Sequence, residues 1–202
     1  MGATDTREHI VEAADRLFYE NGYAATSFAD IAAAVGLSRG NFYYHFKTKD
    51  ELLGAVIARR LASTEAMLAA WEEGASSPVA RIRRFIDILV MNRAKIIAYG
   101  CPVGTLCEEL AKLDHAAQDD AAAIFGAYRG WLAGEFAALG RAADADSLAL
   151  HVLMRSQGIA TLATAFHDEA IIHREVAALT AWLAAEVGEA SRPTPTAPQR
   201  PS

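Results

Sequence analysis

Few of the residues that mark special classes of protein are present in this chain of 202 residues. Only two cysteines occur, which is too few for a disulfide framework. No uncharged apolar run reaches the roughly 18 residues that a membrane-spanning helix needs, and no charged-then-apolar signal peptide opens the sequence. We therefore expect a cytoplasmic protein in a reducing compartment, without a membrane segment.

Several motifs of enzymes are also missing. Glu-x-x-His, the pair that all-helical carboxylate metal sites place one turn apart, does not occur. There is no Gly-x-x-x-x-Gly-Lys phosphate loop and no Cys-x-x-Cys pair, and His151, His167 and His173 are scattered. The sequence therefore predicts no catalytic site, no metal and no cofactor.

Alanine is abundant and runs of strand-favouring residues are missing, which indicates an all-α protein. Hydrophobic residues make up 52% of the chain, enough for a sizeable core. Asp5 and Glu8 resemble a capping box that would open the first helix, which Gly22 would end. Apolar residues at helical spacing then predict helices near residues 49–71, 78–99, 105–113, 115–139, 145–166 and 169–187.

The most specific stretch, residues 26–53, predicts two short helices joined by a tight turn and followed by a longer helix. Ser27 can cap the first short helix in a capping box with Asp30, and Gly36 stands where that helix must stop. Ser38 can cap the second short helix. Two short helices around a tight turn describe a helix-turn-helix, a shape that fits the major groove of DNA.

The second short helix carries an unusual set of polar and amphipathic side chains: Arg39, Asn41, Tyr43, Tyr44 and His45. Phe42 and Phe46, four residues apart, can anchor this helix from beneath. Short hydrogen-bonding residues near a helix start suit base edges and phosphates, and tyrosine hydroxyls suit phosphates. Lys49 lies at the start of the next helix, where backbone N–H groups also favour a phosphate.

These residues give the chain a resemblance to the TetR family of transcriptional regulators. The matching stretches are residues 22–27, 29–32, 35–38 and 41–53, and the resemblance covers roughly residues 6 to 60. It implies that Gly40 and Asn41, at the most variable positions, bear on which DNA sequence is read. With both helix caps and Tyr44 included, the candidate DNA-binding residues are Thr26, Ser27, Ser38, Arg39, Gly40, Asn41, Tyr43, Tyr44, His45 and Lys49.

Some of these residues have structural alternatives. Thr26 could merely cap a helix, Tyr44 could pack over the three-helix unit, and His45 could pack rather than contact a phosphate. The net charge of −6 argues against a DNA binder, but residues 36–60 hold five basic and two acidic side chains, a local balance of +3. Such a patch predicts moderate nonspecific affinity for DNA and a clear dependence on salt.

Breaks in the helical pattern divide the chain into three expected parts: a helix-turn-helix domain over residues 1–50, a helical effector-binding and dimerisation domain over residues 51–188, and a disordered proline-rich tail over residues 189–202. The last two expected helices have apolar stripes broad enough to meet another chain. The resemblance implies that they pair with their copies, and a homodimer would read a palindromic operator in double-stranded DNA. Ordinary packing within one chain would produce similar stripes.

Residues 100–104, Gly-Cys-Pro-Val-Gly, form a second distinctive turn. Cys101 is expected just before a short helix that Thr105 and Glu108 would cap. This turn and the Glu-Glu-Leu after it weakly resemble the effector domain of a TetR branch that responds to small aromatic compounds or reactive electrophiles. Cys101 is therefore a sensor, a wall of a ligand pocket, or a small residue in a turn.

We expect a small apolar or aromatic effector to bind among the helices of residues 78–166 and to release the DNA by linkage. A repressor that senses electrophiles or oxidants through Cys101 is an alternative. A helical ligand-binding adaptor without DNA affinity is another, although the intact Tyr43, His45 and Lys49 argue against it. The candidate lining residues are Tyr99, Cys101, Glu108, Phe125, Trp131, His151, Arg155 and Gln157.

Overall fold

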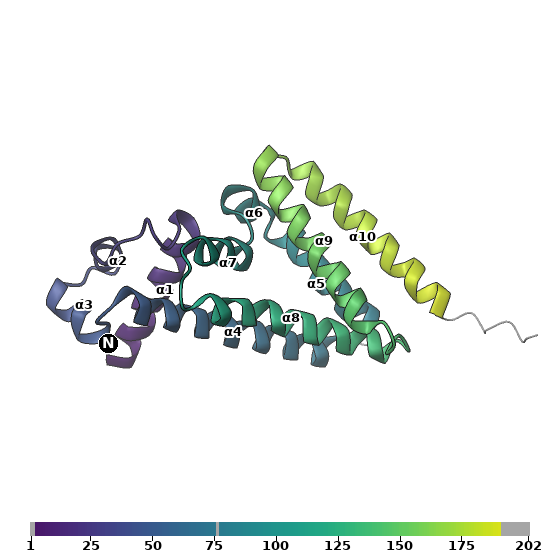
Figure 1. Cartoon of the computed structure of the whole chain (residues 1–202), viewed down its shortest axis with the longest axis horizontal. Coiled ribbons are helices and arrows are strands. Elements are labelled where there is room, and N and C mark those ends of the chain that lie inside the picture. The colour runs from purple at the N-terminus through teal and green to yellow at the C-terminus, as the bar shows by residue number, and fades with distance from the viewer. Residues whose placement is uncertain (1–2, 76, 191–202) are drawn as a thin grey trace, which may run out of the picture.

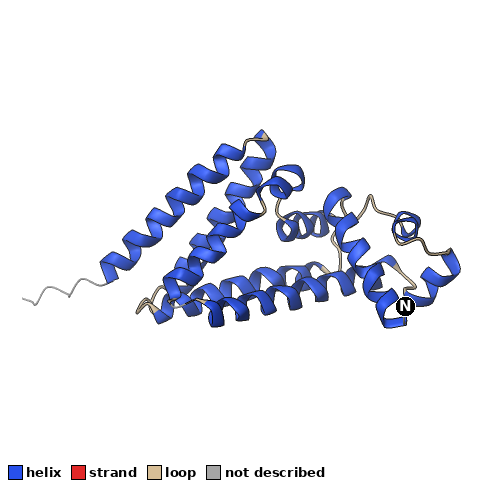
Figure 2. Ribbon diagram, turned by 180° about the vertical axis from the view of Figure 1, so that it is seen from behind, coloured by secondary structure: helices blue, strands red, loops and turns tan. Residues whose placement is uncertain are grey.

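The computed structural model describes residues 3–75 and 77–190, and all regular structure in these two ranges is helical, which confirms the all-α class. No helix within them is both long and apolar enough to cross a membrane. Figures 1 and 2 show the arrangement from opposite sides. The helices are α1 (Ala3–Asn21), α2 (Phe28–Ala34), α3 (Arg39–His45), α4 (Lys49–Gly74), α5 (Pro78–Met91), α6 (Arg93–Tyr99), α7 (Pro102–Lys112), α8 (Gln118–Ala138), α9 (Ala145–Phe166) and α10 (Glu169–Ala190).

Helices α1, α2 and α3 form a small unit at one end of the molecule, which we call the head (Figure 1). Its core is built from side chains that the helical spacing places on inward faces, and the start of α4 closes it from below. The fully buried members include Ile10, Ile31, Phe42, Phe46 and Leu52. The same cluster includes Val103, Leu106 and Leu110 of α7 and Ala121 and Ile124 of α8, so the apolar centre of the head is continuous with these two helices.

Helices α4 to α10 form the larger unit, which we call the body. α4 and α8 lie side by side, and α9 and α10 pair at the end away from the head (Figure 1). A second core cluster joins α5, α8, α9 and α10. An ion pair crosses this cluster: the Arg81 guanidinium lies 2.8 Å from the Glu135 carboxylate, which is 5% exposed.

Several helix boundaries differ from those expected from sequence; for example, α4 ends at Gly74 instead of near residue 71, and α8 begins at Gln118 instead of near residue 115. α1 begins at Ala3, before the expected cap at Asp5. The expected helix over residues 78–99 is broken at Asn92, whose side-chain amide donates to the Ile88 carbonyl at 3.0 Å and so competes with the helical backbone. α7 begins at Pro102 instead of Thr105, because proline suits the first helical position and Cys101 takes the capping position.

The expected disordered tail is only partly within the described structure. α10 extends to Ala190, so residues 189 and 190 are helical, which corrects the expected boundary. Residues 191–202 lie outside the described residues.

Candidate nucleic-acid interface

The caps expected from sequence shape the head. Ser27 and Asp30 form the capping box: the Asp30 N–H donates to the Ser27 hydroxyl at 3.2 Å, and the Ser27 N–H donates to the Asp30 carboxylate at 2.8 Å. The Ser27 hydroxyl also donates to the Asp30 carboxylate at 2.6 Å, and this bond, followed by that of the Ser27 N–H, holds the pKa of Asp30 below its usual value. Gly36 has φ +67°, the left-handed conformation that ends α2, and Ser38 caps α3. The predicted helix-turn-helix is therefore confirmed as a structure.

α3 has one buried and one open face. Phe42 is 1% exposed and packs edge-on against Phe28, with ring centroids 4.9 Å apart. On the open face, Asn41 is exposed and a Cβ added to Gly40 would meet no atom within 4 Å. Tyr43 is 47% exposed, so its ring is held at the edge of the core while part of it faces outward. α3 lies at the outer end of the head (Figure 1), where another molecule can approach it.

The candidate DNA-binding residues differ in how much of each side chain is accessible from outside. Thr26 is only 2% exposed, and its hydroxyl donates to the Gly22 carbonyl at 2.7 Å, so its side chain holds the turn before α2 and is closed to DNA. Tyr44 is 74% exposed, so the interpretation that it packs over the head is wrong. His45 is partly buried and meets Tyr44 edge-on. The side chain of Arg39 lies outside the described structure.

Lys49 holds the turn that joins α1 to α2. Its ammonium donates to the carbonyls of Tyr23, Thr26 and Ala24 at 2.9, 3.2 and 3.4 Å, and it lies 4.2 Å from the centre of the Tyr23 ring. An ammonium has three N–H donors, so all of them are engaged here. A phosphate contact by Lys49 would require at least one of these hydrogen bonds to open.

Sequence reasoning missed two features of the head. Arg7 on α1 is exposed, with its guanidinium 4.5 Å from the centre of the Phe46 ring, just after α3. Residues 36–40 also match the Gly-x-Ser-x-Gly spacing of a hydrolase nucleophile. That motif needs a strand-to-helix turn, whereas here it joins two helices and Ser38 serves as a cap. The match is therefore a coincidence of spacing.

Comparisons with known proteins agree with this geometry. The family model described as "Bacterial regulatory proteins, tetR family" matches residues 10–56, which include the whole helix-turn-helix. A crystal structure of a TetR transcriptional regulator from Legionella pneumophila superposes with a TM-score of 0.76 and 26% identity, covering 89% of this chain and 95% of that one. The chain belongs to the TetR family of transcriptional regulators.

Two curated relatives carry names of the same kind. The chain is 29% identical over 126 residues to the HTH-type transcriptional repressor DhaR of Mycobacterium sp. (strain GP1), covering 62% of each chain. It is 37% identical over 112 residues to an uncharacterized HTH-type transcriptional regulator in the lacX 3'region of Lactococcus lactis subsp. lactis, covering 54% of this chain and 57% of that protein. The matches thus span less than two thirds of these relatives.

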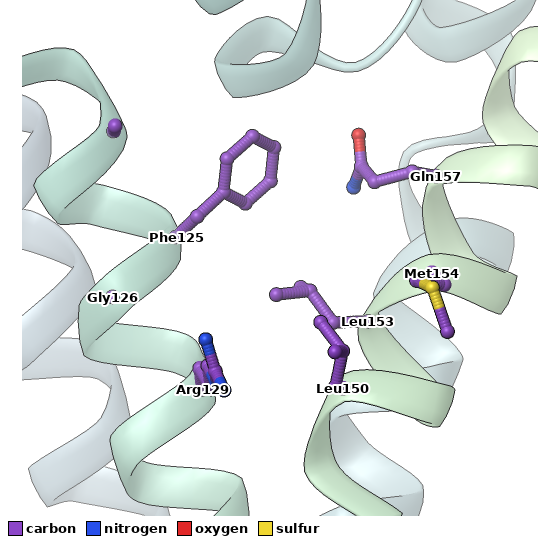
Figure 3. Close-up of a pocket in the computed structure, with 8 residues that line it drawn as sticks. Phe125, Gly126, Arg129, Leu150, Leu153, Met154 and Gln157 are labelled. Carbon is purple, nitrogen blue, oxygen red and sulfur yellow. The ribbon is translucent and has the colours of Figure 1, made fainter. Parts of the chain in front are cut away.

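The body of this TetR-family chain has an open groove between α8 and α9, with a volume of about 510 Å³. Phe125 on α8 and Leu153 and Gln157 on α9 point toward one another across it (Figure 3). At one end Arg129 makes a two-pronged ion pair with Asp146, at 2.6 and 2.7 Å. The full lining is Ala122, Phe125, Gly126, Arg129, Leu150, Leu153, Met154 and Gln157.

Only Phe125 and Gln157 of the eight candidate effector-binding residues line this groove. Glu108 is exposed on α7. The others contact neighbours elsewhere: Tyr99 meets Tyr19, Trp131 meets Trp71, His151 meets Trp182, Arg155 pairs with Glu175, and Cys101 caps α7. Helical spacing predicts which residues lie in helices, but it does not predict which helix faces pack against one another.

Tyr23 connects the head to the body. It is buried, and its hydroxyl donates to the Asp50 carboxylate at 2.5 Å, while its ring lies edge-on to His115. Burial, followed by the bond to Asp50, raises the pKa of Tyr23 well above its usual value, so the hydroxyl stays a donor. The same hydrogen bond, aided by His115, lowers the pKa of Asp50.

Tyr23→Phe is expected to lower the free energy of unfolding by about 0.5–1 kcal/mol at pH 7, because it removes this hydrogen bond. Asp50 has a lowered pKa in the folded state, so its stabilising contribution is present above the ordinary carboxyl pKa and is lost as pH falls through the lowered one. The difference from the wild type should therefore shrink at pH about 3. Urea unfolding at both pH values measures it, and an undiminished difference at low pH would contradict the assignment.

Proposed function

We propose that this protein is a homodimeric repressor that binds a palindromic operator through α3 and is released by a small apolar or aromatic molecule. The observation that carries the proposal is the division of α3 into a buried anchor at Phe42 and an open face at Gly40, Asn41 and Tyr43. A helix held in this way can enter the major groove without losing contact with the head.

The open face suggests separate roles for its residues in DNA binding. Gly40 and Asn41 lie in the first turn of α3, where recognition helices meet base edges, and the asparagine amide can pair with a base. Tyr43 and His45 lie further along, where a hydroxyl or imidazole can donate to phosphate oxygens. Arg7, beside the end of α3, adds a cation for the backbone. Base contacts would set specificity, and phosphate contacts would set orientation.

An apolar surface of the body supports dimerisation. Met154, Leu162 and Phe166 on α9 are 58%, 50% and 67% exposed, although they are large hydrophobic side chains. The neighbouring face of α10 is rich in small exposed residues that permit close helix contact, namely Ala170, Ala177, Ala178, Ala181, Ala184 and Ala185. Pairing these faces would give a four-helix bundle, and its twofold axis would place two α3 helices about 34 Å apart on a palindrome.

The α8–α9 groove suits an apolar effector. Phe125, Leu150 and Leu153 supply its apolar walls, and the Gln157 amide supplies one hydrogen-bonding group. The charge of Arg129 is already balanced by Asp146, so a neutral molecule fits better than an acid. A ligand that prefers a dimer with a different spacing of heads would weaken operator binding by linkage.

Cys101 supports a second candidate function, repression controlled by thiol chemistry. Its Sγ accepts a hydrogen bond from the Gly104 N–H at 3.5 Å and so caps α7. Modification by an electrophile would remove that cap and disturb the start of α7. Burial raises the pKa of the Cys107 thiol, which disfavours its thiolate. An operator affinity that falls after treatment with N-ethylmaleimide in the wild type, but not in Cys101→Ser, would favour this candidate.

Tyr43→Ala is expected to weaken operator binding about tenfold, because it removes a phosphate hydrogen bond of about 1.5 kcal/mol. Tyr43→Phe should give most of this loss, since it keeps the ring that contacts Phe28 and removes only the hydroxyl. Fluorescence anisotropy on a duplex enriched by the wild-type protein measures both affinities. Unchanged affinity in both variants would contradict the assignment of Tyr43 as a phosphate contact, whereas failure of the wild type to bind any duplex would favour the adaptor alternative.

A further inference from the structure

One carboxylate of the body accepts two hydrogen bonds from the backbone of the head. Glu109 on α7 accepts hydrogen bonds from two successive backbone N–H groups in the turn after α1, those of Tyr23 and Ala24, each at 2.8 Å. Gly22 precedes them with φ +89°, and a Cβ there would lie only 3.2 Å from both carboxylate oxygens. The backbone of this turn is thus shaped to receive the Glu109 carboxylate, although the two partners are about 86 residues apart in sequence.

The same turn is held from its other side. Lys49 on α4 donates to the carbonyls of Tyr23, Ala24 and Thr26, as described above. The backbone N–H groups therefore face α7 and the carbonyls face α4. Because the turn leads directly into the capping residue of α2, the position of α7 bears on the placement of the helix-turn-helix.

Two further contacts hold Gly100 and the first residue of α7 against α1 and α4. The Tyr19 hydroxyl on α1 donates to the Gly100 carbonyl at 2.8 Å. Arg60 on α4 donates to the Pro102 carbonyl at 2.6 Å and to Asp15 on α1, also at 2.6 Å. Together with Glu109, these contacts connect α7 to the head at both of its ends.

The first turn of α7 also touches the groove. A Cβ added to Gly104 would lie 2.6 Å from the side-chain oxygen of Gln157, so the Gln157 amide packs directly against the α7 backbone. Gln157 is one of the residues that line the groove (Figure 3). Gly104 and Glu109 are five residues apart, or about 7.5 Å along the helix. One short helix therefore contacts both the groove lining and the head turn.

We propose that Glu109 is a positioning residue that sets the orientation of the head for DNA binding, and that α7 transmits changes at the α8–α9 groove to it. This inference rests on the proposed function as a DNA-binding regulator. A ligand that displaces Gln157 would shift the first turn of α7 and, through the rigid helix, the carboxylate that holds Tyr23 and Ala24. Glu109 acts through the backbone of the turn and needs no contact with DNA.

Glu109→Gln tests, in the absence of DNA, the pair of hydrogen bonds from the Tyr23 and Ala24 N–H groups to the Glu109 carboxylate, which we call the clamp. A carboxylate accepts from both N–H groups, whereas an amide offers one oxygen and turns its own N–H groups toward the other donor. Hydrogen exchange at the Tyr23 and Ala24 amides should become at least about tenfold faster, since local opening costs less free energy. Glu108→Gln, an exposed neighbour on the same helix, is the matched control and should leave these rates unchanged. Equal rates in Glu109→Gln and the wild type would overturn the clamp.

Measurements of operator affinity then test whether Glu109 positions the head for DNA binding. Glu109→Gln should weaken binding to the wild-type-enriched duplex about tenfold, while the slope of log K against log salt stays unchanged, because no phosphate contact is lost. Glu108→Gln should bind as the wild type does. An unchanged affinity in Glu109→Gln would overturn the positioning role. Failure of the wild type to bind any duplex at low salt would refute the proposed DNA-binding function. The hydrogen-exchange measurement needs no DNA, so it tests the clamp independently of that function.

Gly104→Ala tests the link to the groove. Its methyl group must displace the flexible end of Gln157, which mimics a change in the groove, while the clamp residues stay intact. We expect Gly104→Ala to change operator affinity in the wild type but to have little further effect in Glu109→Gln, because both act along one path. Effects that simply add in the double variant would overturn transmission through α7.

Discussion

Phe42→Ala is expected to destabilise the protein by about 3–5 kcal/mol and to abolish operator binding at moderate salt. Phe42 is 1% exposed and packs within the buried cluster of the head, so removal of its ring leaves a cavity among side chains that can relax only in part. Its ring meets Phe28 at 4.9 Å and borders Tyr43, so its loss also frees the open face of α3. Urea unfolding and fluorescence anisotropy on the same preparation measure the two effects.

Tyr44→Ala is the matched control for this prediction. Tyr44 is an aromatic residue on the same helix but is 74% exposed, so its removal should change stability by less than about 0.5 kcal/mol. Similar losses of unfolding free energy in Phe42→Ala and Tyr44→Ala would contradict this prediction, because α3 would then have no anchored face.

Arg81→Met is expected to lower the free energy of unfolding by about 3 kcal/mol, since it leaves the buried Glu135 carboxylate without its cation. The Arg81 Nε donates to both carboxylate oxygens at 2.9 Å, and a second guanidinium nitrogen donates to the Ala75 carbonyl at 3.3 Å. The hydrogen bond to Glu135 raises the pKa of Arg81, so the guanidinium stays charged. The pair links α5 to α8 beside the end of α4.

Two variants control for this result. Arg16→Met breaks an exposed ion pair with Glu20 and should change stability little. The double replacement of Arg81 by methionine and Glu135 by leucine removes both charges and should recover most of the lost stability, as an apolar pair needs no counter-ion. A double variant as unstable as Arg81→Met would show that the guanidinium acts through packing or through its bond to Ala75.

The sequence predicted best the features that are set by local chemistry. Three features of the head depend only on residues within about four positions of one another: the capping box of Ser27 and Asp30, the left-handed Gly36 and the cap at Ser38. The local sequence is therefore enough to predict each of them. Phe42 and Phe46 were identified as anchors by the same reasoning, because spacing of four places both on one face of a helix.

Features that depend on distant parts of the chain could not be predicted. Nothing near Glu109 indicates that its carboxylate meets backbone N–H groups at Tyr23 and Ala24, because those groups carry no side-chain signature. The buried position of Thr26 likewise follows from the approach of α1 and α4, not from its neighbours. The groove is defined by the crossing of α8 and α9, so helical spacing found Phe125 and Gln157 but also residues on other faces.

The measurement that tests the central claim most directly is selection of bound fragments from the source genome by the purified protein, with Tyr43→Ala in parallel. Reading of DNA by paired α3 helices predicts enrichment of a palindromic site with half-sites about one helical turn apart, and loss of that enrichment in the variant. A lack of enrichment at low salt, or the same fragments enriched by both proteins, would contradict the account.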